Sequence, residues 1–241
     1  LRSSGDVYMR SSWLENASYT GFHLRKLGCG HGHDDILHFD LYANQRDYLV
    51  DSGRYSYVDN DLREYFKGNR SHNTLGVDDL PNSVYKNTWE NEYEARSQGV
   101  YTHLSDNFDY AEAENTAYQR LTDPVSMKRR LLFLIDNVWI VVDSFAANGK
   151  HKYSQYFNFP NDKVQIDEEN NRVLTSYNKD NLVIVPVNKV DMVLEESWVS
   201  TDYNLKEKAL SAEFFSNATG FTSFISLLYF PEQTTLNYKK V

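Results

Sequence analysis

Three short segments of this chain carry side chains that can bind a metal ion or transfer protons. The chain has seven histidines, and three of them, His31, His33 and His38, fall within eight residues. Asp51 follows an apolar Leu-Val pair, and His72 begins a His-Asn-Thr sequence. Imidazole nitrogens and carboxylate oxygens are the ligands that zinc prefers, and the same groups act as general acids and bases. The three segments therefore predict a metal site, a proton-transfer site, or both.

Local geometry leaves two histidines open as the partner of Asp51. If Asn44-Gln45 is a two-residue hairpin turn, the numbers of paired residues sum to 89, so that His38 faces Asp51. His33 lies five residues farther along and reaches Asp51 only if its loop folds back over the strand ends. Pairing alone therefore favours His38. An interpretation without a metal, in which His38 is a strand residue and Asp51 begins a turn, also stays open.

Composition excludes several classes of function. The 241 residues are 41% hydrophobic and 24% charged, which is ordinary for a globular protein with a substantial core. A net charge of −9 argues against nucleic acid as a partner, and no apolar run is long enough for a membrane span. The single cysteine, Cys29, excludes an internal disulfide. Because the chain begins Leu-Arg-Ser rather than with methionine, we expect it to be a fragment of a longer protein.

Apolar and polar residues alternate with a period of two in many short segments, and Asn, Asp and Gly turns separate these segments. This pattern predicts one all-β domain over residues 1–241, with two or more stacked antiparallel sheets. We expect one short helix at 61–66 with Asp61 as its cap, and we place Lys128–Arg130 on an edge or a solvent face. The expected strands are 37–41, 48–50, 111–119, 126–134, 139–144, 155–159, 172–176, 182–186 and 223–230, with turns at 135–137, 147–149 and 168–171.

Four segments between residues 30 and 74 carry a resemblance to a known family. They are Gly30-His-Gly-His-Asp-Asp-Ile-Leu-His-Phe-Asp-Leu-Tyr-Ala-Asn44, Leu49-Val-Asp-Ser-Gly-Arg-Tyr-Ser-Tyr57, Arg63-Glu-Tyr-Phe66 and Ser71-His-Asn-Thr74. Together they resemble the C-terminal domain of the heparinase II/III family of polysaccharide lyases. Weaker similarity follows in family order at 7–13, 128–133, 139–143 and 197–203.

The resemblance implies a large multilayered antiparallel β-sandwich with few short helices. We expect an α/α toroid domain of the same parent protein to precede it. It also implies a divalent metal, commonly zinc, with Ca²⁺ or Mn²⁺ as alternatives. The family holds this metal with three motif positions, which match His33, Asp51 and His72. The resemblance therefore favours His33 as the ligand, and His38 is the second choice.

The implied reaction is β-elimination on an acidic polysaccharide or oligosaccharide that contains uronic acid. A base removes the C5 proton, an acid protonates the departing C4 oxygen, and the carboxylate must be neutralised. The family pattern implies His31 as a catalytic residue, together with a tyrosine, for which we choose Tyr65 over Tyr57. A tyrosine can serve as acid and base if nearby cations lower its pKa from about 10. The expected substrate-binding residues are Arg63, Asn69 and Arg70.

The resemblance also implies a partner domain and a location. In much of the family an essential asparagine and tyrosine come from the toroid, so we expect this chain to be inactive or weak alone. We expect a periplasmic or secreted protein, with the cytoplasm as the alternative. One competing interpretation is a non-catalytic carbohydrate-binding β-sandwich with a structural metal. Another is a cupin-like metal enzyme, which the lack of a second glycine-bounded metal motif disfavours.

Overall fold

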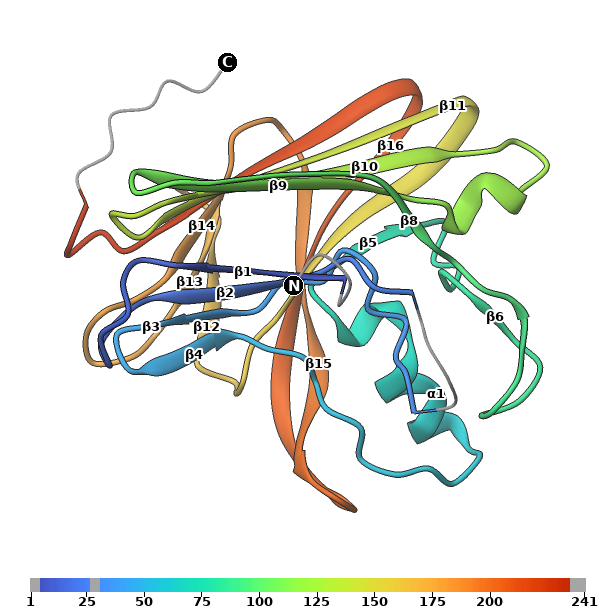
Figure 1. Cartoon of the computed structure of the whole chain (residues 1–241), viewed down its shortest axis with the longest axis horizontal. Helices are drawn as coiled ribbons and strands as arrows, with labels where there is room; N and C mark the ends of the chain where they lie inside the picture. The colour runs from blue at the N-terminus through green and yellow to red at the C-terminus, as the bar shows by residue number, and fades with distance from the viewer. Residues whose placement is uncertain (1–4, 27–30, 235–241) are drawn as a thin grey trace.

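The computed structural model describes residues 5–26 and 31–234, so Cys29 lies outside the described residues. Two antiparallel sheets of ten and four strands lie face to face (Figure 1). Within the described ranges, a two-stranded sheet and three short helices accompany them. The predicted all-β sandwich is therefore confirmed. No helix in these ranges has the length and apolar character needed to cross a membrane.

The ten-stranded sheet is built on two long strands, β11 (Val138–Asn158) and β16 (Leu205–Tyr229), which pair along most of their length. The turn expected at 147–149 is wrong, because a register shift between Ala146 and Lys150 lets β11 continue through it as one bulged strand. The other strands of this sheet are β5 (Leu75–Val77), β8 (Ser97–Leu104), β9 (Phe108–Asn115), β10 (Ser126–Leu134), β12 (Val164–Asp167), β13 (Arg172–Thr175), β14 (Val183–Pro186) and β15 (Asp191–Asp202).

The smaller elements position the loops of the site. The strand expected at 37–41 is wrong over most of its range: Leu37 has a φ of 64°, Phe39 makes only an isolated bridge to Phe22, and the strand β3 begins at Leu41. The expected helix is present, but its cap is Asn60 rather than Asp61, since the Asn60 side chain accepts from the Arg63 amide. These elements are β1 (Asp6–Arg10), β2 (Tyr19–His23), β3 (Leu41–Ala43), β4 (Arg46–Leu49), β6 (Val84–Tyr85), β7 (Asn91–Tyr93), α1 (Asp61–Lys67), η1 (Asn69–Ser71) and η2 (Ala117–Arg120).

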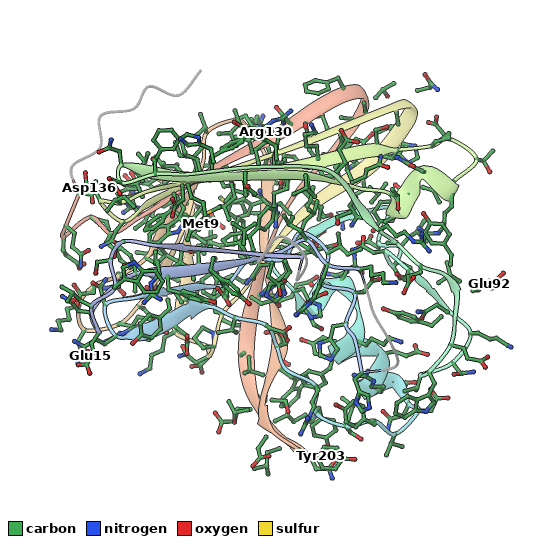
Figure 2. All side chains as sticks on the ribbon, viewed as in Figure 1. Met9, Glu15, Glu92, Arg130, Asp136 and Tyr203 are labelled. Carbon is green, nitrogen blue, oxygen red and sulfur yellow. The ribbon has the colours of Figure 1, made fainter. Side chains whose placement is uncertain are left out.

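The main core lies between the two large sheets. Met9 of β1 is fully buried there, whereas Arg130 of β10 lies on the outer side of the ten-stranded sheet (Figure 2). Trp139 stacks on Phe133 with ring centroids 4.8 Å apart, and its Nε1 donates to the Thr20 hydroxyl of the four-stranded sheet over 2.8 Å. An aromatic side chain with its polar atom satisfied thus joins the two layers.

The basic run on β10 differs from the expectation. β10 lies between β9 and β11, so it is an interior strand rather than an edge. Arg129 points inward and is fully buried, where its guanidinium pairs with Asp143 through two bonds of 2.8 and 2.6 Å. Lys128 and Arg130 point to the other side and form ion pairs with Glu112. The prediction was wrong for Arg129 because alternation along a strand puts its side chain on the opposite face.

Candidate metal centre

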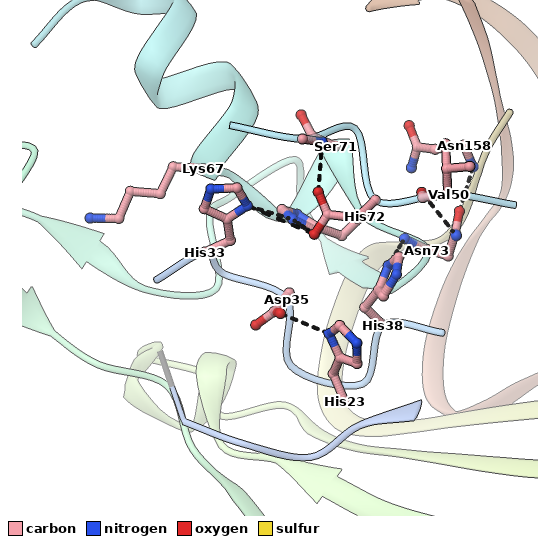
Figure 3. Close-up of polar contacts among 12 residues, drawn as sticks. His23, His33, Asp35, His38, Val50, Lys67, Ser71, His72, Asn73 and Asn158 are labelled. Carbon is pink, nitrogen blue, oxygen red and sulfur yellow. Dashed lines mark hydrogen bonds and ion pairs between the residues drawn. The ribbon is translucent and has the colours of Figure 1, made fainter. Parts of the chain in front are cut away.

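Three segments that are far apart in the sequence meet beside the ends of β4 and β5. His33 comes from the loop between β2 and β3, Asp51 follows β4, and His72 lies between η1 and β5. His72 Nε2 is 3.2 Å from Asp51 Oδ2 and 3.3 Å from His33 Nδ1, and the third separation, His33 Nδ1 to Asp51 Oδ2, is 3.8 Å (Figure 3). The structure therefore brings together the three residues predicted as metal ligands.

The donor set fits a small divalent cation. In a tetrahedral zinc site with bonds of about 2.1 Å, neighbouring ligand atoms lie about 3.4 Å apart. The three separations range from 3.2 to 3.8 Å, close to that value. Two imidazole nitrogens and one carboxylate oxygen match the mixed nitrogen and oxygen ligands of zinc and leave a fourth position for another group.

Local contacts orient two of the three ligands, His72 and Asp51. His72 is fully buried, and its Nδ1 donates to the Gly68 carbonyl over 2.8 Å, so that Nε2 is the atom that faces the centre. Asp51 accepts the Gly53 amide on Oδ1 over 2.7 Å and turns Oδ2 inward. A Cβ atom at Gly53 would lie 2.1 Å from the Ser200 carbonyl, so only glycine fits this turn.

The two charges at the centre stabilise each other. Burial lowers the pKa of His72, but the Asp51 carboxylate outweighs this effect and raises the pKa to about 9. Burial raises the pKa of Asp51, but His72 and His33 together bring it well below its usual range. Without a metal, His72 is therefore protonated at neutral pH, and a cation must displace this proton to bind.

Asn73 and Thr74 of the His-Asn-Thr sequence hold the three segments together. The Asn73 amide group donates to the carbonyls of Phe39 and Val50 over 2.8 and 3.2 Å, and its oxygen accepts the Asn158 amide of β11. The Thr74 hydroxyl donates to the Ile36 carbonyl. Both side chains are fully buried, so their bonds are shielded from water.

The buried Arg129 of β10 holds the same loops to the ten-stranded sheet. Its Nη1 donates to the carbonyls of Leu37 and Asn73, while the rest of the guanidinium is paired with Asp143. These two carbonyls belong to the residues next to His38 and His72. A charge in the core thus connects the ten-stranded sheet to the loops of the site.

The hairpin argument for His38 is wrong in its register. Ala43 pairs with Arg46 and Tyr42 with Asp47, as expected, but a bulge then pairs Leu41 with Leu49, so the alignment that would place His38 opposite Asp51 is lost. His38 is fully buried, and its Nδ1 accepts the main-chain N–H of Asn73 over 2.9 Å (Figure 3). Burial brings the pKa of His38 well below its usual range. This histidine supports the backbone next to His72.

A cavity of about 680 Å³ opens beside the centre, and His31 and Tyr57 both line it with His33. The rings of His31 and Tyr57 meet edge to face with centroids 4.6 Å apart, and Trp89 packs against both, at 5.7 Å from His31 and 5.9 Å from Tyr57. His31 is exposed, and Tyr57 is half-buried. An imidazole and a phenol thus lie side by side at the wall of an open cavity, where both can reach a bound molecule.

The other predicted site residues lie around this cavity rather than in its lining, as far as the described residues show. Tyr65 accepts the Trp198 amide on its hydroxyl over 3.0 Å, which joins α1 to β15. Arg63 is buried, with Nη1 3.3 Å from His33 Nε2 and its guanidinium carbon 5.1 Å from the centre of the Tyr57 ring. The catalytic role expected for Tyr65 and the substrate-binding role expected for Arg63 stay predictions.

Asn69 and Arg70 contact neighbouring structure. The buried Asn69 amide donates to the Leu75 carbonyl and the Tyr118 hydroxyl, both at 3.4 Å. Arg70 is half-exposed and forms ion pairs with acidic side chains. Their expected contact with a substrate also stays a prediction.

The cavity holds cationic side chains that we did not single out from the sequence. Arg25, Lys26 and Arg54 are among its lining residues. Arg54 follows the Asp-Ser-Gly turn directly, so its closeness to Asp51 was a usable signal. Arg25 also bonds the cavity carboxylate of Asp35 over 3.1 Å, beside a 2.8 Å bond from His23 to the same oxygen. Burial raises the pKa of Asp35, but these partners bring it below its usual range.

Comparison with known proteins gives consistent matches. A sequence profile described as "Heparinase II/III-like, C-terminal" matches residues 19–228. A heparin-sulfate lyase of Pedobacter heparinus is 26% identical over 239 residues, covering 95% of this chain and 34% of that protein. A heparin-sulfate lyase of Bacteroides thetaiotaomicron is 27% identical over 164 residues, covering 64% of this chain and 21% of that protein. This chain therefore spans about a third or less of these relatives.

Comparison with solved structures gives a similar match. The crystal structure of heparan sulfate lyase HepC from Pedobacter heparinus superposes with a TM-score of 0.82 at 24% identity. The match covers 96% of this chain and 36% of that one. At this identity the likeness concerns the fold, which is the same β-sandwich.

Proposed function

Because this chain belongs to the family of heparinase II/III-like C-terminal domains, we propose that it is the metal-bearing domain of a polysaccharide lyase. The lyase would cleave a uronic-acid-containing glycan by β-elimination. The observation that carries the proposal is the cavity that His31 and Tyr57 share with His33 and Asp51. The relatives named heparin-sulfate lyases support a glycosaminoglycan as the substrate.

His33, Asp51 and His72 are the residues that would hold the metal, and their two nitrogens and one oxygen favour zinc. When bound, the metal would supply positive charge at the cavity wall and hold three loops in place. Arg25, Lys26 and Arg54 would add to this charge where a uronate carboxylate enters. Neutralising the carboxylate makes the C5 proton more acidic and stabilises the charge that develops when it leaves.

His31 and Tyr57 would carry the two proton transfers, and Tyr57, the second choice from the sequence, takes the place of Tyr65 because it lines the cavity. We assign His31 as the base that takes the C5 proton, after which the electron pair forms the C4–C5 double bond and the C4–O bond breaks. The Tyr57 hydroxyl then protonates the departing C4 oxygen, so that no water is consumed. The 4.6 Å between the two rings allows both to reach one sugar ring.

The domain would need its expected partner. The chain spans about a third of its curated relatives, which is consistent with an N-terminal toroid that covers the cavity and supplies further catalytic groups. Since the cavity is open to solvent, an isolated chain would bind the glycan weakly and turn it over slowly. An extracytoplasmic location, where such glycans occur, belongs to the same proposal.

The test uses the parent protein and an unsulfated uronate glycan, with ultraviolet absorbance of the unsaturated product as the measurement. Absorbance should rise with the parent protein. The rate of this rise should be about 100-fold lower in His31→Ala, and it should be small with this chain alone. Glycan binding without any product from the parent protein would instead establish a carbohydrate-binding domain with a structural metal, and the lyase proposal would be abandoned.

A further inference from the structure

A second cavity of about 620 Å³ lies at the other end of the sandwich. It is formed where β1 ends and β2 begins, beside the turn between β8 and β9. The turn that carries Glu15 and the hairpin that carries Tyr203, near the first cavity, lie far apart (Figure 2). Nothing in the proposed proton transfers uses this second cavity. Its lining residues are Tyr8, Arg10, Trp13, Tyr19, Leu104, Ser105, Asp106 and Asp109.

The strand register gathers the aromatic side chains of this cavity on one face. Arg10 of β1 pairs with Tyr19 of β2, so their side chains point to the same side of the sheet, and Tyr8 lies two residues earlier on that side. The rings of Tyr8 and Tyr19 stack with centroids 5.9 Å apart and planes inclined by 21°. Met9, between Tyr8 and Arg10 in the sequence, is buried in the core and anchors the strand.

Trp13 is the most exposed large apolar side chain among the described residues, at 87%. Its orientation is nevertheless set, because the Arg10 guanidinium carbon lies 4.3 Å from the ring centroid, over one face of the indole. Arg10 is itself held by a 2.9 Å bond from Nε to the Ser12 carbonyl. Trp13 and the Ser12 carbonyl thus hold the guanidinium in place before a ligand binds.

The polar groups of the cavity differ in their availability. Asp109 is buried and accepts the Ser105 amide at 3.2 Å, and the Ser105 hydroxyl donates to the Phe108 carbonyl at 2.6 Å, so both stabilise the turn. Asp106 is exposed. Within the described part of the chain, the terminal nitrogens of Arg10 have no hydrogen-bond partner. The cavity therefore presents one cationic double donor and one carboxylate acceptor next to flat apolar rings.

This combination matches a sugar ring that bears a carboxylate. The C–H face of a pyranose can pack on an indole or phenol ring, its hydroxyls can donate to Asp106, and its carboxylate can pair with the guanidinium in a bidentate manner. A concave site of a few hundred Å³ with few polar groups is the usual shape of a small-ligand site, whereas protein interfaces are flatter. We propose that this second cavity is a glycan subsite that holds a uronate ring against the half-exposed ring of Tyr8, with its carboxylate on Arg10. The identity of the glycan rests on the proposed function.

The test follows the indole N–H signals of the ¹⁵N-labelled 241-residue chain while a heparosan hexasaccharide, an unsulfated chain of glucuronate and N-acetylglucosamine, is added. The chain has four tryptophans, of which Trp89 lies next to His31 in the first cavity and so reports on that site. The Trp13 signal should shift, because the guanidinium that lies over its ring binds the carboxylate, and Tyr8→Ala, which keeps this signal, should abolish the corresponding binding. Arg10→Gln should weaken it by about tenfold or more. Phe221→Ala, which removes a 72% exposed ring on β16, should leave it unchanged.

The outcomes separate this subsite from the proposed active site. A shift of Trp89 alone would overturn the subsite and leave the lyase proposal standing. A Trp13 shift of equal size with neutral cellohexaose, or an unchanged affinity in Arg10→Gln, would overturn recognition of the carboxylate. A silent Trp13 signal at saturation of the chain would overturn the subsite altogether. Because Tyr8 and Arg10 are both partly exposed, an unchanged backbone spectrum will verify that the variants are folded.

Discussion

The side-chain amide of Asn73 donates to the main-chain carbonyl of Val50 over 3.2 Å, so the neighbour of one predicted metal ligand holds the neighbour of another. The same amide also bonds the Phe39 carbonyl and the Asn158 amide of β11. One buried side chain thus sets the distance between Asp51 and His72. The site is therefore built into the sandwich core, although its ligands come from loops.

Asn73→Ala should destabilise the fold strongly. The change leaves two buried carbonyls and one buried amide without their partners, so the free energy of unfolding should fall by about 2 to 4 kcal/mol. Urea denaturation measures this loss. Asn107→Ala, at an exposed position in the β8–β9 turn, is the control and should change stability by less than about 0.5 kcal/mol. Equal effects in the two variants would contradict the role given to Asn73.

Metal content should depend on His33 rather than on His38. The wild-type chain should bind one divalent ion after dialysis against zinc. His33→Ala or Asp51→Asn should reduce the metal affinity by about 100-fold, because each removes one of three ligands. His38→Gln keeps an acceptor for the Asn73 amide and should retain the ion. Elemental analysis distinguishes these cases. Metal kept by His33→Ala but lost by His38→Gln would reverse the ligand assignment.

The two candidate tyrosines should respond differently to loss of the hydroxyl. In the parent protein, Tyr57→Phe should slow product formation by about 100-fold with little change in stability, because Tyr57 lines the cavity beside His31. Tyr65→Phe removes the acceptor of the Trp198 amide, so it should cost about 1 kcal/mol of stability and leave the rate within about threefold. Initial rates and melting curves of both variants test this. The reverse pattern would restore Tyr65 as the catalytic residue.

The buried Arg129–Asp143 pair should show strong coupling. Arg129→Met leaves a carboxylate unpaired in the core and removes the donor to the Leu37 and Asn73 carbonyls, so we expect a loss of about 3 to 5 kcal/mol. Arg130→Met, the next residue on the outer face, should cost less than about 1 kcal/mol. Adding Asp143→Leu to Arg129→Met should recover part of the loss in urea denaturation. A double variant no more stable than Arg129→Met would refute the coupling.

His151 should make stability depend on pH. Burial lowers the pKa of His151, but its bonds to Asp78 at 2.6 Å and Asp123 at 3.1 Å outweigh this effect and raise the pKa above 6.5. A raised pKa stabilises the fold fully below pH 6.5, and this contribution is lost as pH rises through the folded-state value. The gain is less than about 1 kcal/mol, because the ion pairs are near the surface. The difference in melting temperature between wild type and His151→Gln should therefore shrink from pH 5.5 to pH 8.5, and a constant difference would contradict the assignment.

The sequence alone determined the fold class and the chemistry of the site. Alternation of apolar residues is a local property, and it predicts strands such as β10 at their observed bounds. The types and order of His33, Asp51 and His72 likewise belong to the sequence, and their resemblance to a family motif identified them as a set. These features need no knowledge of which segments meet in space.

Tertiary structure decided which side chains face each other. The bulge between Leu41 and Tyr42 and the positive φ of Leu37 changed the register that had favoured His38, and neither follows from local propensity. The inward position of Arg129 depends on Asp143 and on two carbonyls from distant loops. The position of Tyr57 at the cavity depends on main-chain bonds that tie Ser52 and Tyr55 to the β15–β16 hairpin. Such choices are set by the burial and pairing of polar groups from separate segments, which only the folded chain brings together.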